Sequence, residues 1–201
     1  MIHTVRQIRQ ELNGLLDKIC ATGKQGVIID VDEAIAETAK IILDASSAGG
    51  KLIFIGNGGS AAIASHMAVD FWKNAKVKAI AFNDASLLTC LSNDFGYEHV
   101  FEKSIDMFGY TEDILIAISS SGESANILNG ARIAKKKGMV VITLSGFKED
   151  NSLRSLGYIN FYVPSIDYGH VEVIHHYLCH CFVNIILKKT DTFLSCTNQP
   201  G

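Results

Sequence analysis

The sequence predicts an α/β protein with a three-layer, doubly wound fold around a mainly five-stranded parallel sheet, preceded by N-terminal helices. Short apolar runs alternate with segments in which apolar residues recur every three or four positions. That alternation is typical of strands and helices in a parallel sheet. The runs are apolar at nearly every residue, as in strands that are buried on both faces.

The expected elements follow in chain order. Helical spacing begins the chain, with apolar residues at Val5, Ile8, Leu12, Leu15 and Ile19. A second helix is expected over 31–48, so two helices precede the first strand. Five strands are expected at 51–55, 78–82, 113–118, 139–144 and 159–163. Further helices are expected over 60–72, 124–138 and 171–187.

Length and composition predict one domain. The 201 residues are 48% hydrophobic, enough for one sizeable core. We expect a single domain over 1–188, including the N-terminal helices, and a C-terminal tail over 189–201, where the periodic pattern ends.

The charge pattern, the N-terminus and the cysteines exclude some classes of protein. The formal net charge is −3, and no cluster of cations exceeds the three lysines at 135–137. Nucleic-acid binding is therefore not expected. The N-terminus lacks the features of a signal peptide or a membrane span. An odd number of cysteines, five, without paired spacing is typical of free thiols in a cytoplasmic protein.

Two loops that follow predicted strands have the chemistry of a phosphate site. The first is GNGGS, from Gly56 to Ser60, and the second is SSSGES, from Ser119 to Ser124. Glycines permit close approach of the backbone, and hydroxyls beside a helix N-terminus surround a phosphate with donors. Neither loop has the nucleoside-triphosphate pattern of glycines followed by Lys-Ser/Thr.

Each loop also has an alternative interpretation. The first satisfies the loose dinucleotide pattern G-x-G-x-x-G/A, with Asp84 near the place of a ribose-binding acid. In the second, Ser120 and Glu123 have the spacing of a capping box, which would make the loop only a helix start.

Two helices carry possible metal ligands. His66 and Asp70, four residues apart, share one helix face. On the last helix, Glu172, His176 and His180 share one broad stripe, with His175 at its edge. Glu172 and His180 are separated by a rise of about 12 Å, so His176 competes with them as a ligand. Glu172 and His175 have the Glu-x-x-His spacing of di-iron bundles, but a second such motif is absent from the sequence.

The ordered motifs GNGGSA, SNDFGYEHVF, ISSSGESANIL, GMVVITLSG and VPS before the His-rich helix resemble the sugar isomerase (SIS) domain. Within it they resemble the phosphoheptose isomerases, over nearly the whole chain. The resemblance implies a cytoplasmic homotetramer with active sites between subunits, one zinc ion per subunit and a phosphosugar substrate. It also implies conversion of sedoheptulose 7-phosphate to D-glycero-D-manno-heptose 7-phosphate, for heptose of bacterial lipopolysaccharide or capsule.

The resemblance also assigns site residues. Asp70 is the expected base and His180 the expected acid of catalysis. The metal ligands fall on His66, Asp70, Glu172 and His180. The substrate contacts fall on Asn57, Gly58, Gly59, Ser60, Asn93, Asp94, Ser119, Ser120, Ser121, Ser124 and Glu172.

Two ligand positions depart from the family pattern, which usually has Glu at Asp70 and Gln at Glu172. Glu172 adds a negative charge, which should tighten binding of a dication and weaken its Lewis acidity. The alternatives are therefore an isomerase for another phosphosugar and a non-catalytic SIS module that binds a sugar or a partner protein.

Overall fold

The computed structural model describes the backbone of residues 4–197 and the side chains of residues 4–189. The helices are α1 (Val5–Leu16), α2 (Val31–Ser47), α3 (Gly59–Lys73), α4 (Ala85–Phe95), α5 (Val100–Phe108), α6 (Ala125–Lys136) and α7 (Tyr168–Thr197). The strands are β1 (Cys20–Thr22), β2 (Ile28–Ile29), β3 (Leu52–Ile55), β4 (Ala79–Ala81), β5 (Ile114–Ser119), β6 (Val140–Ser145) and β7 (Ile159–Tyr162).

All of the described strands belong to one sheet, in the order β2-β1-β7-β6-β5-β3-β4. The five strands from β3 to β7 are parallel, while β1 pairs antiparallel with both β2 and β7. The central strand β5 pairs with β3 through Phe54 and Ile116, and with β6 through Ala117 and Thr143. The carboxyl ends of the parallel strands therefore meet at one edge, where ligands of such sheets bind.

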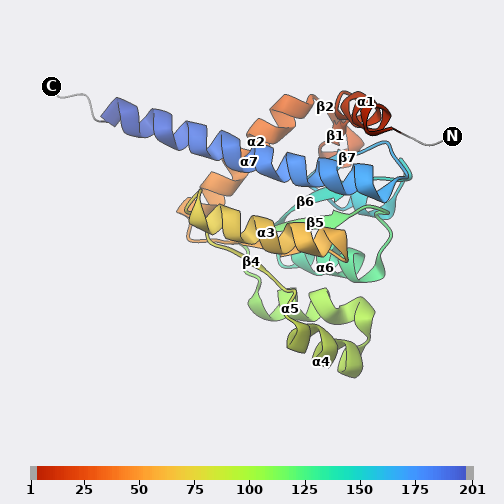
Figure 1. Cartoon of the computed structure of the whole chain (residues 1–201). Coiled ribbons are helices and arrows are strands. Elements are labelled where there is room, and N and C mark those ends of the chain that lie inside the picture. Colours follow the sequence, from red (N-terminus) through yellow and green to blue (C-terminus); the bar gives the residue numbers. More distant parts are fainter. Residues whose placement is uncertain (1–3, 198–201) are drawn as a thin grey trace.

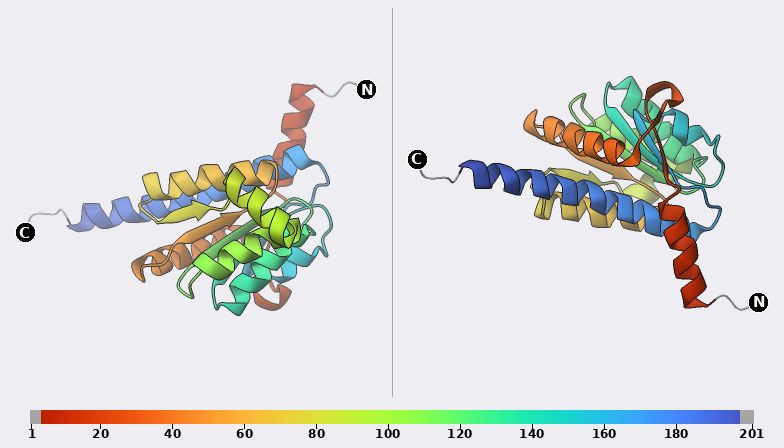
Figure 2. Two further views of the ribbon diagram at one scale, coloured as in Figure 1. Left: turned by 90° about the horizontal axis from the view of Figure 1, so that it is seen from below. Right: turned by 90° about the horizontal axis from the view of Figure 1, so that it is seen from above.

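The sheet is the middle of three layers (Figures 1 and 2). Alternate residues of each strand belong to opposite cores, because successive side chains of a strand point to opposite faces. Leu52 and Phe54 of β3 pack in the core formed with α2, α3 and α7. Ile53 and Ile55 pack in the core formed with α5 and α6. Burial on both faces explains why these strands are apolar throughout.

The five predicted parallel strands and the helices between them are confirmed within a few residues. The expectation that two helices precede the first strand is wrong, since β1 and β2 lie between α1 and α2. These strands of three and two residues are too short to produce a recognisable alternation. Two further helices, α4 and α5, were not predicted.

The helix α7 continues to Thr197, past the expected start of the tail, and extends beyond the rest of the molecule (Figure 1). The division into a domain over 1–188 and a tail stays a prediction, and residues 198–201 lie outside the described part of the chain. Among the helices of residues 4–197, none combines the length and apolar character needed to cross a membrane.

Candidate functional site

The two predicted phosphate loops meet in one pocket at the carboxyl ends of β3 and β5. Its volume is about 230 Å³. Predicted residues supply most of its lining, while Ile118 and Tyr168 were not predicted. The predicted lining residues are Asn57, Gly58, Gly59, Ser60, Ser119, Ser120, Ser121, Ser124 and Glu172. We call this hollow the serine pocket.

The glycine turn forms one wall of the serine pocket. Gly58 has φ +52°, ψ −122°, a conformation that side-chain-bearing residues rarely adopt, and it precedes α3 without a side-chain cap. A Cβ on Gly56 would lie 2.5 Å from the backbone of Ser60. The turn is thus built of glycine for steric reasons, and it aims the N-terminus of α3 at the pocket.

Asn57 is held by residues that the sequence analysis did not identify. Its amide nitrogen donates to Oδ1 of Asn126 over 2.9 Å, and Nδ2 of Asn126 donates back to Oδ1 of Asn57 over 2.8 Å. The hydroxyl of Tyr97 also donates to Oδ1 of Asn57, at 2.9 Å. The side chain is therefore fixed between α6 and the segment before α5. Only chain folding brings these residues together, so no sequence spacing could have indicated them.

The serine loop is folded on itself in a way that leaves hydroxyls available. The Gly122 N–H donates to Oγ of Ser119 over 3.1 Å, and the Glu123 N–H donates to Oγ of Ser121 over 3.2 Å. The hydroxyls of Ser119 and Ser124 lie 3.4 Å apart. The Ser120 hydroxyl is buried without a hydrogen-bond partner. An unpartnered buried hydroxyl is costly unless water or a ligand satisfies it.

The capping-box interpretation of this loop is wrong. The helix α6 begins at Ala125, with Ser124 as its N-cap residue, and the side chain of Ser124 makes no capping hydrogen bond. The carboxylate of Glu123 instead accepts from the Ser152 N–H over 2.6 Å. The Ile127 N–H donates to Oδ1 of Asn126 over 3.0 Å, so among the described residues it is the N–H groups of Ala125 and Asn126 that are left for another acceptor.

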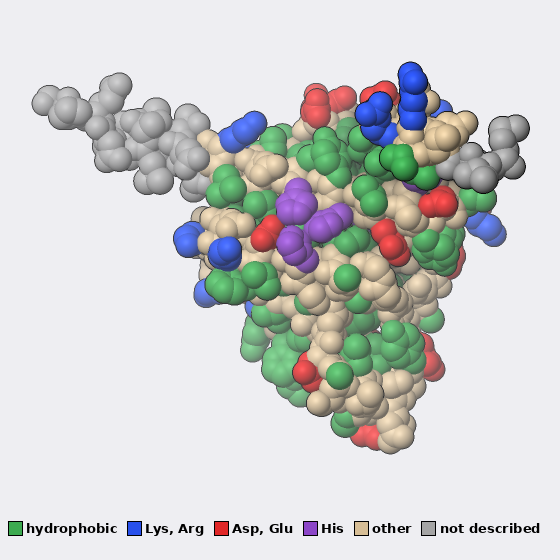
Figure 3. All heavy atoms as spheres, in the orientation of Figure 1, with side chains coloured by type: hydrophobic (Ala, Val, Ile, Leu, Met, Phe, Trp, Pro, Cys, Tyr) green, Lys and Arg blue, Asp and Glu red, His purple; other side chains and the backbone are tan. Residues whose placement is uncertain are grey.

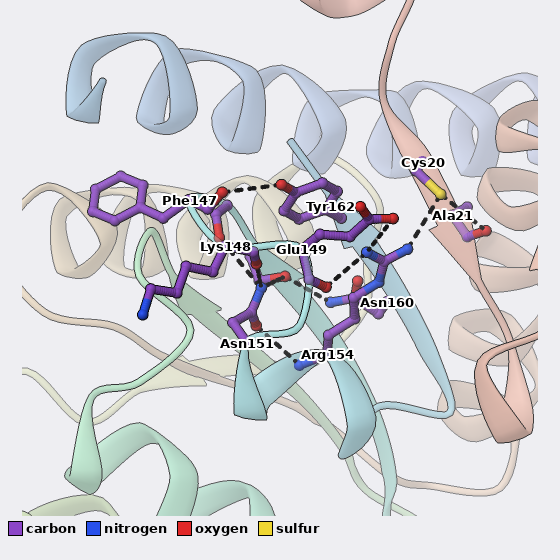
Figure 4. Close-up of polar contacts among 11 residues, drawn as sticks. Cys20, Ala21, Phe147, Lys148, Glu149, Asn151, Arg154, Asn160 and Tyr162 are labelled. Carbon is purple, nitrogen blue, oxygen red and sulfur yellow. Dashed lines mark hydrogen bonds and ion pairs between the residues drawn. The ribbon is translucent and has the colours of Figure 1, made fainter. Parts of the chain in front are cut away.

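The loop after β6 supports the serine loop from behind. The Leu153 N–H donates to the carbonyl oxygen of Gly122 over 3.0 Å. Gly122 has φ +67°, and a Cβ there would lie 2.1 Å from Oδ1 of Asn151. Figure 4 shows Asn151 pointing into its own loop, where its amide donates to the carbonyl oxygen of Lys148 over 2.7 Å. The backbone of the serine loop is therefore fixed by a neighbouring rigid turn.

The dinucleotide interpretation loses its acidic residue. Asp84 is the N-cap of α4, and its Oδ1 accepts from the N–H groups of Ser86 and Leu87 over 2.9 and 3.1 Å. This carboxylate therefore caps the start of α4, which explains an acidic residue at this position without a bound ribose.

A histidine–carboxylate cluster lies further along α3 and α7, the two helices that border the serine pocket. Potential ligand atoms of His66, His176 and His180 all lie within 4.8 Å of one another. Oδ2 of Asp70 lies 3.5 Å from Nε2 of His66 and 3.7 Å from Nδ1 of His180. Figure 3 shows histidine side chains gathered on this face of the molecule. Three of the four predicted metal ligands thus converge, and His176 joins them.

The environment of His176 favours its neutral form. Burial lowers the pKa of His176, and the neighbouring His180 and His66 lower it further, against the opposing effect of Asp70. A metal ion binds neutral imidazole, so a lowered pKa suits His176 to metal binding.

Glu172 lies apart from the cluster. An ideal Cβ on Gly59 would be 2.3 to 2.5 Å from the carboxylate atoms of Glu172, so this carboxylate rests on the start of α3. It lines the serine pocket, as predicted for a substrate contact. Its role as a metal ligand stays a prediction.

Asn93 and Asp94 are not among the residues that line the serine pocket. Both lie in the last turn of α4 and are exposed. The amide of Asn93 donates to Oδ1 of Asp94 over 2.9 Å, and the Cys90 thiol contacts Oδ2 of Asp94 at 3.7 Å. Their predicted contact with substrate is untested.

In the sequence, His175 lies at the edge of the stripe and has Glu-x-x-His spacing with Glu172. It is fully buried, and its Nε2 lies 3.1 Å from the carbonyl oxygen of Ser145. Burial lowers its pKa from 6.5 to about 4, against the opposing effect of that hydrogen bond. His175 is therefore a neutral part of the core beneath the cluster.

Comparison with known proteins gives one consistent result. The SIS domain family matches residues 21–146. Phosphoheptose isomerases of Serratia proteamaculans and Yersinia pestis are each 37% identical over 188 residues, which is 90% of this chain and 95% of theirs.

Solved structures agree with this. The phosphoheptose isomerase GmhA from Neisseria gonorrhoeae superposes with a TM-score of 0.79 at 28% identity, over 90% of this chain and 97% of that one. A phosphoheptose isomerase from Francisella tularensis gives a TM-score of 0.76 at 26% identity, over 92% and 98% of the two chains. With a matching family model over residues 21–146, relatives at 37% identity over 90% of the chain and a shared fold, this chain belongs to the phosphoheptose isomerase family of SIS-domain proteins.

Proposed function

We propose that this protein is a phosphoheptose isomerase that converts sedoheptulose 7-phosphate to D-glycero-D-manno-heptose 7-phosphate, for the heptose of bacterial lipopolysaccharide or capsule. One observation carries the proposal: the serine pocket and the histidine–carboxylate cluster border the same two helices, α3 and α7. A sugar phosphate offers an anion at one end and a carbonyl group at the other. The relatives at 37% identity support the choice of a heptose.

The phosphate belongs in the serine pocket. We assign its oxygens to the hydroxyls of Ser119, Ser120, Ser121 and Ser124 and to the first two N–H groups of α6. These neutral donors, together with the helix dipole, bind a phosphate without a lysine. The unpartnered hydroxyl of Ser120 supports this assignment, because a phosphate oxygen would satisfy it.

The sugar lies between the phosphate and the cluster. We assign its hydroxyls to Asn57, to the turn of Gly58, Gly59 and Ser60, and to Glu172. Asn57 is supported by the hydrogen bonds that hold its side chain, since fixed groups lose little entropy on binding. Asn93 and Asp94 stay predicted sugar contacts.

The reaction moves protons between two neighbouring carbons and their oxygens. Asp70, the base, takes a proton from C1 of the ketose, which leaves an enediolate, and returns a proton to C2. His180 transfers the hydroxyl proton of O1 to O2, so that an aldehyde replaces the ketone. The 3.7 Å contact between Oδ2 of Asp70 and Nδ1 of His180 supports this pairing, because the two groups then act at one site.

The cluster fits a zinc ion. Imidazole nitrogens and a carboxylate oxygen are ligands that zinc commonly takes. We propose one zinc ion per subunit, held by His66, Asp70 and His180. When bound, zinc polarises a carbonyl group and stabilises negative charge on its oxygen.

We also propose a cytoplasmic homotetramer, as in the family resemblance. Exposed apolar side chains beside the cluster support association. Val69 and Trp72 of α3 are 45% and 52% exposed, and Val173 and Tyr177 of α7 are 54% and 52% exposed. Such a group of exposed side chains is typical of a surface that another subunit covers.

A second phosphosugar remains an alternative substrate. Glu172 adds a carboxylate to the serine pocket, where it would repel an anionic group close to it and accept from sugar hydroxyls. A substrate with a different hydroxyl pattern would suit this change. A non-catalytic module that binds a sugar or a partner is the other alternative.

The test is turnover of sedoheptulose 7-phosphate by zinc-loaded protein, with a chelator-treated sample beside it. We expect formation of the aldoheptose 7-phosphate only with zinc. Asp70→Asn and His180→Ala should each abolish turnover without loss of folded structure. A folded, zinc-loaded protein that leaves this sugar unchanged would refute the heptose assignment, and a panel of other phosphosugars would then separate the two alternatives.

A further inference from the structure

We infer that His176, in place of Glu172, is the fourth metal ligand, so that the metal is held by His66, Asp70, His176 and His180. This inference rests on the metal of the proposed function and names its ligands. The family resemblance assigned Glu172 to this position instead. The two ligand sets differ in the number of imidazoles, three against two.

The three imidazoles lie close together. The ring centroid of His176 lies 5.0 Å from that of His66 and 4.7 Å from that of His180, and the centroids of His66 and His180 are 5.6 Å apart. Their potential ligand atoms lie within 4.8 Å of one another. Ligand atoms of a tetrahedral zinc site are about 3.3 Å apart, given zinc–nitrogen bonds of about 2.0 Å. Small side-chain rotations would close this difference.

Asp70 lies beside two of the three histidines. Its Oδ2 is 3.5 Å from Nε2 of His66 and 3.7 Å from Nδ1 of His180, close to the separation of two ligands on one zinc ion. We assign this carboxylate, with the three imidazoles of the group, to a four-ligand set from α3 and α7.

His176 has a nitrogen without a partner. Its Nε2 is buried, and no hydrogen bond to it is formed within the described residues. Both helices, α3 and α7, present histidine to the same small volume. A metal ion would satisfy the unpartnered nitrogen of His176.

Glu172 lies too far along the axes of α3 and α7 from His66 to join the cluster. Its carboxylate rests on Gly59, and the seven residues from Gly59 to His66 correspond to a rise of about 10 Å along α3. His176 is one turn further along α7 than Glu172 and lies beside His66. The carboxylate of Glu172 would have to leave the serine pocket to join the cluster.

Replacing Glu172 by His176 as the fourth ligand changes the net charge of the metal site. A dication with Asp70 and Glu172 as ligands forms a site of net charge zero, whereas Asp70 with three neutral imidazoles leaves a net charge of +1. A positive site stabilises the enediolate better. The chain therefore combines a carboxylate in the sugar region with a metal centre that keeps its Lewis acidity.

X-ray absorption at the zinc edge tests the ligand set without any substitution. On zinc-loaded protein without sugar, we expect scattering from three imidazoles per zinc. Two imidazoles would overturn the inference, and so would failure of the protein to bind zinc in equilibrium dialysis.

Two matched variants provide an independent test. We expect His176→Ala to weaken zinc binding at least about 100-fold, since loss of groups that only orient ligands already costs 10- to 100-fold. Glu172→Ala should change zinc affinity less than about threefold. Affinity is measured by competition with a chromophoric chelator, and circular dichroism checks the fold of both variants. The reverse order of effects would overturn the inference.

Neither test uses a sugar, so its failure is separable from failure of the proposed function. Zinc bound by three imidazoles in a protein that does not isomerise the heptose phosphate would uphold the ligand set and refute the activity. Zinc bound by two imidazoles in an active isomerase would refute only the ligand set.

Discussion

The buried His175 should make the protein lose stability in mild acid. Its side chain is 0% exposed, and its pKa is lowered from 6.5 to about 4 by burial. A histidine that ionises more readily in the unfolded chain favours unfolding below its unfolded pKa. Its contribution to stability is complete above pH 6.5 and is lost as the pH falls toward 4.

The size of the effect follows from the two pKa values. Their difference, from 6.5 to about 4, corresponds to about 3 kcal/mol of unfolding free energy at 1.36 kcal/mol per pH unit. A loss of this size is a large part of the stability of a typical domain, which is about 5–15 kcal/mol.

His175→Gln is the matched variant. Glutamine does not titrate, and its amide can donate to the carbonyl oxygen of Ser145, which the imidazole contacts over 3.1 Å. Urea unfolding of chelator-treated protein at several pH values between 7 and 4 gives the free energy of unfolding of each form. We expect the native form to lose about 3 kcal/mol more than the variant across this range.

Chelator treatment matters because zinc would also stabilise the folded state in a pH-dependent way. Equal slopes of unfolding free energy against pH in the two proteins would refute the reasoning. So would an NMR titration in which the His175 ring protonates near pH 6.5 in the folded protein.

Three further substitutions test the site. Asp70→Asn should lower kcat at least about 100-fold, because a base commonly contributes that much or more, while circular dichroism stays unchanged; a kcat within tenfold of native would remove Asp70 from proton transfer. Ser121→Ala should raise KM for the phosphosugar about tenfold with kcat preserved, since a hydrogen bond to a charged group is worth about 1.5 kcal/mol or more; an unchanged KM would limit the serine loop to a structural role. Gly122→Ala should destabilise the protein by about 2 kcal/mol or more in thermal unfolding, because its φ of +67° penalises a Cβ that would also meet Asn151; an unchanged melting temperature would contradict the described turn.

The central strands could be predicted because strands that are buried on both faces are apolar at nearly every residue. Strands such as β5, which is buried along its whole length, have no polar face. The strands β1 and β2 were missed because strands of three and two residues are too short to show an alternation of apolar and polar side chains. The helices α4 and α5 were missed because their segment, which includes Asn93 and Asp94, was interpreted only through turn chemistry and a family motif.

Local chemistry in the sequence indicated the two loops of the serine pocket. Glycines that permit a tight turn and serines before a helix are recognisable without a structure. The residues that fix these loops were not recognisable in the sequence. Asn126 and Tyr97, from distant parts of the chain, form hydrogen bonds with Asn57. The side chain of Asn151 lies against Gly122.

The sequence by itself determined the parallel sheet, the two loops of the serine pocket and the helices that carry histidine and carboxylate. Only the tertiary structure decided which of those groups meet. On α7, Glu172, His176 and His180 share one stripe, and helical spacing alone permits either Glu172 or His176 to join His180. The packing of α7 on α3 sets the level at which each side chain faces its neighbour, so Glu172 rests on Gly59 and His176 lies beside His66. Spacing fixes positions within one helix, but the offset between two helices depends on the packing of the whole core.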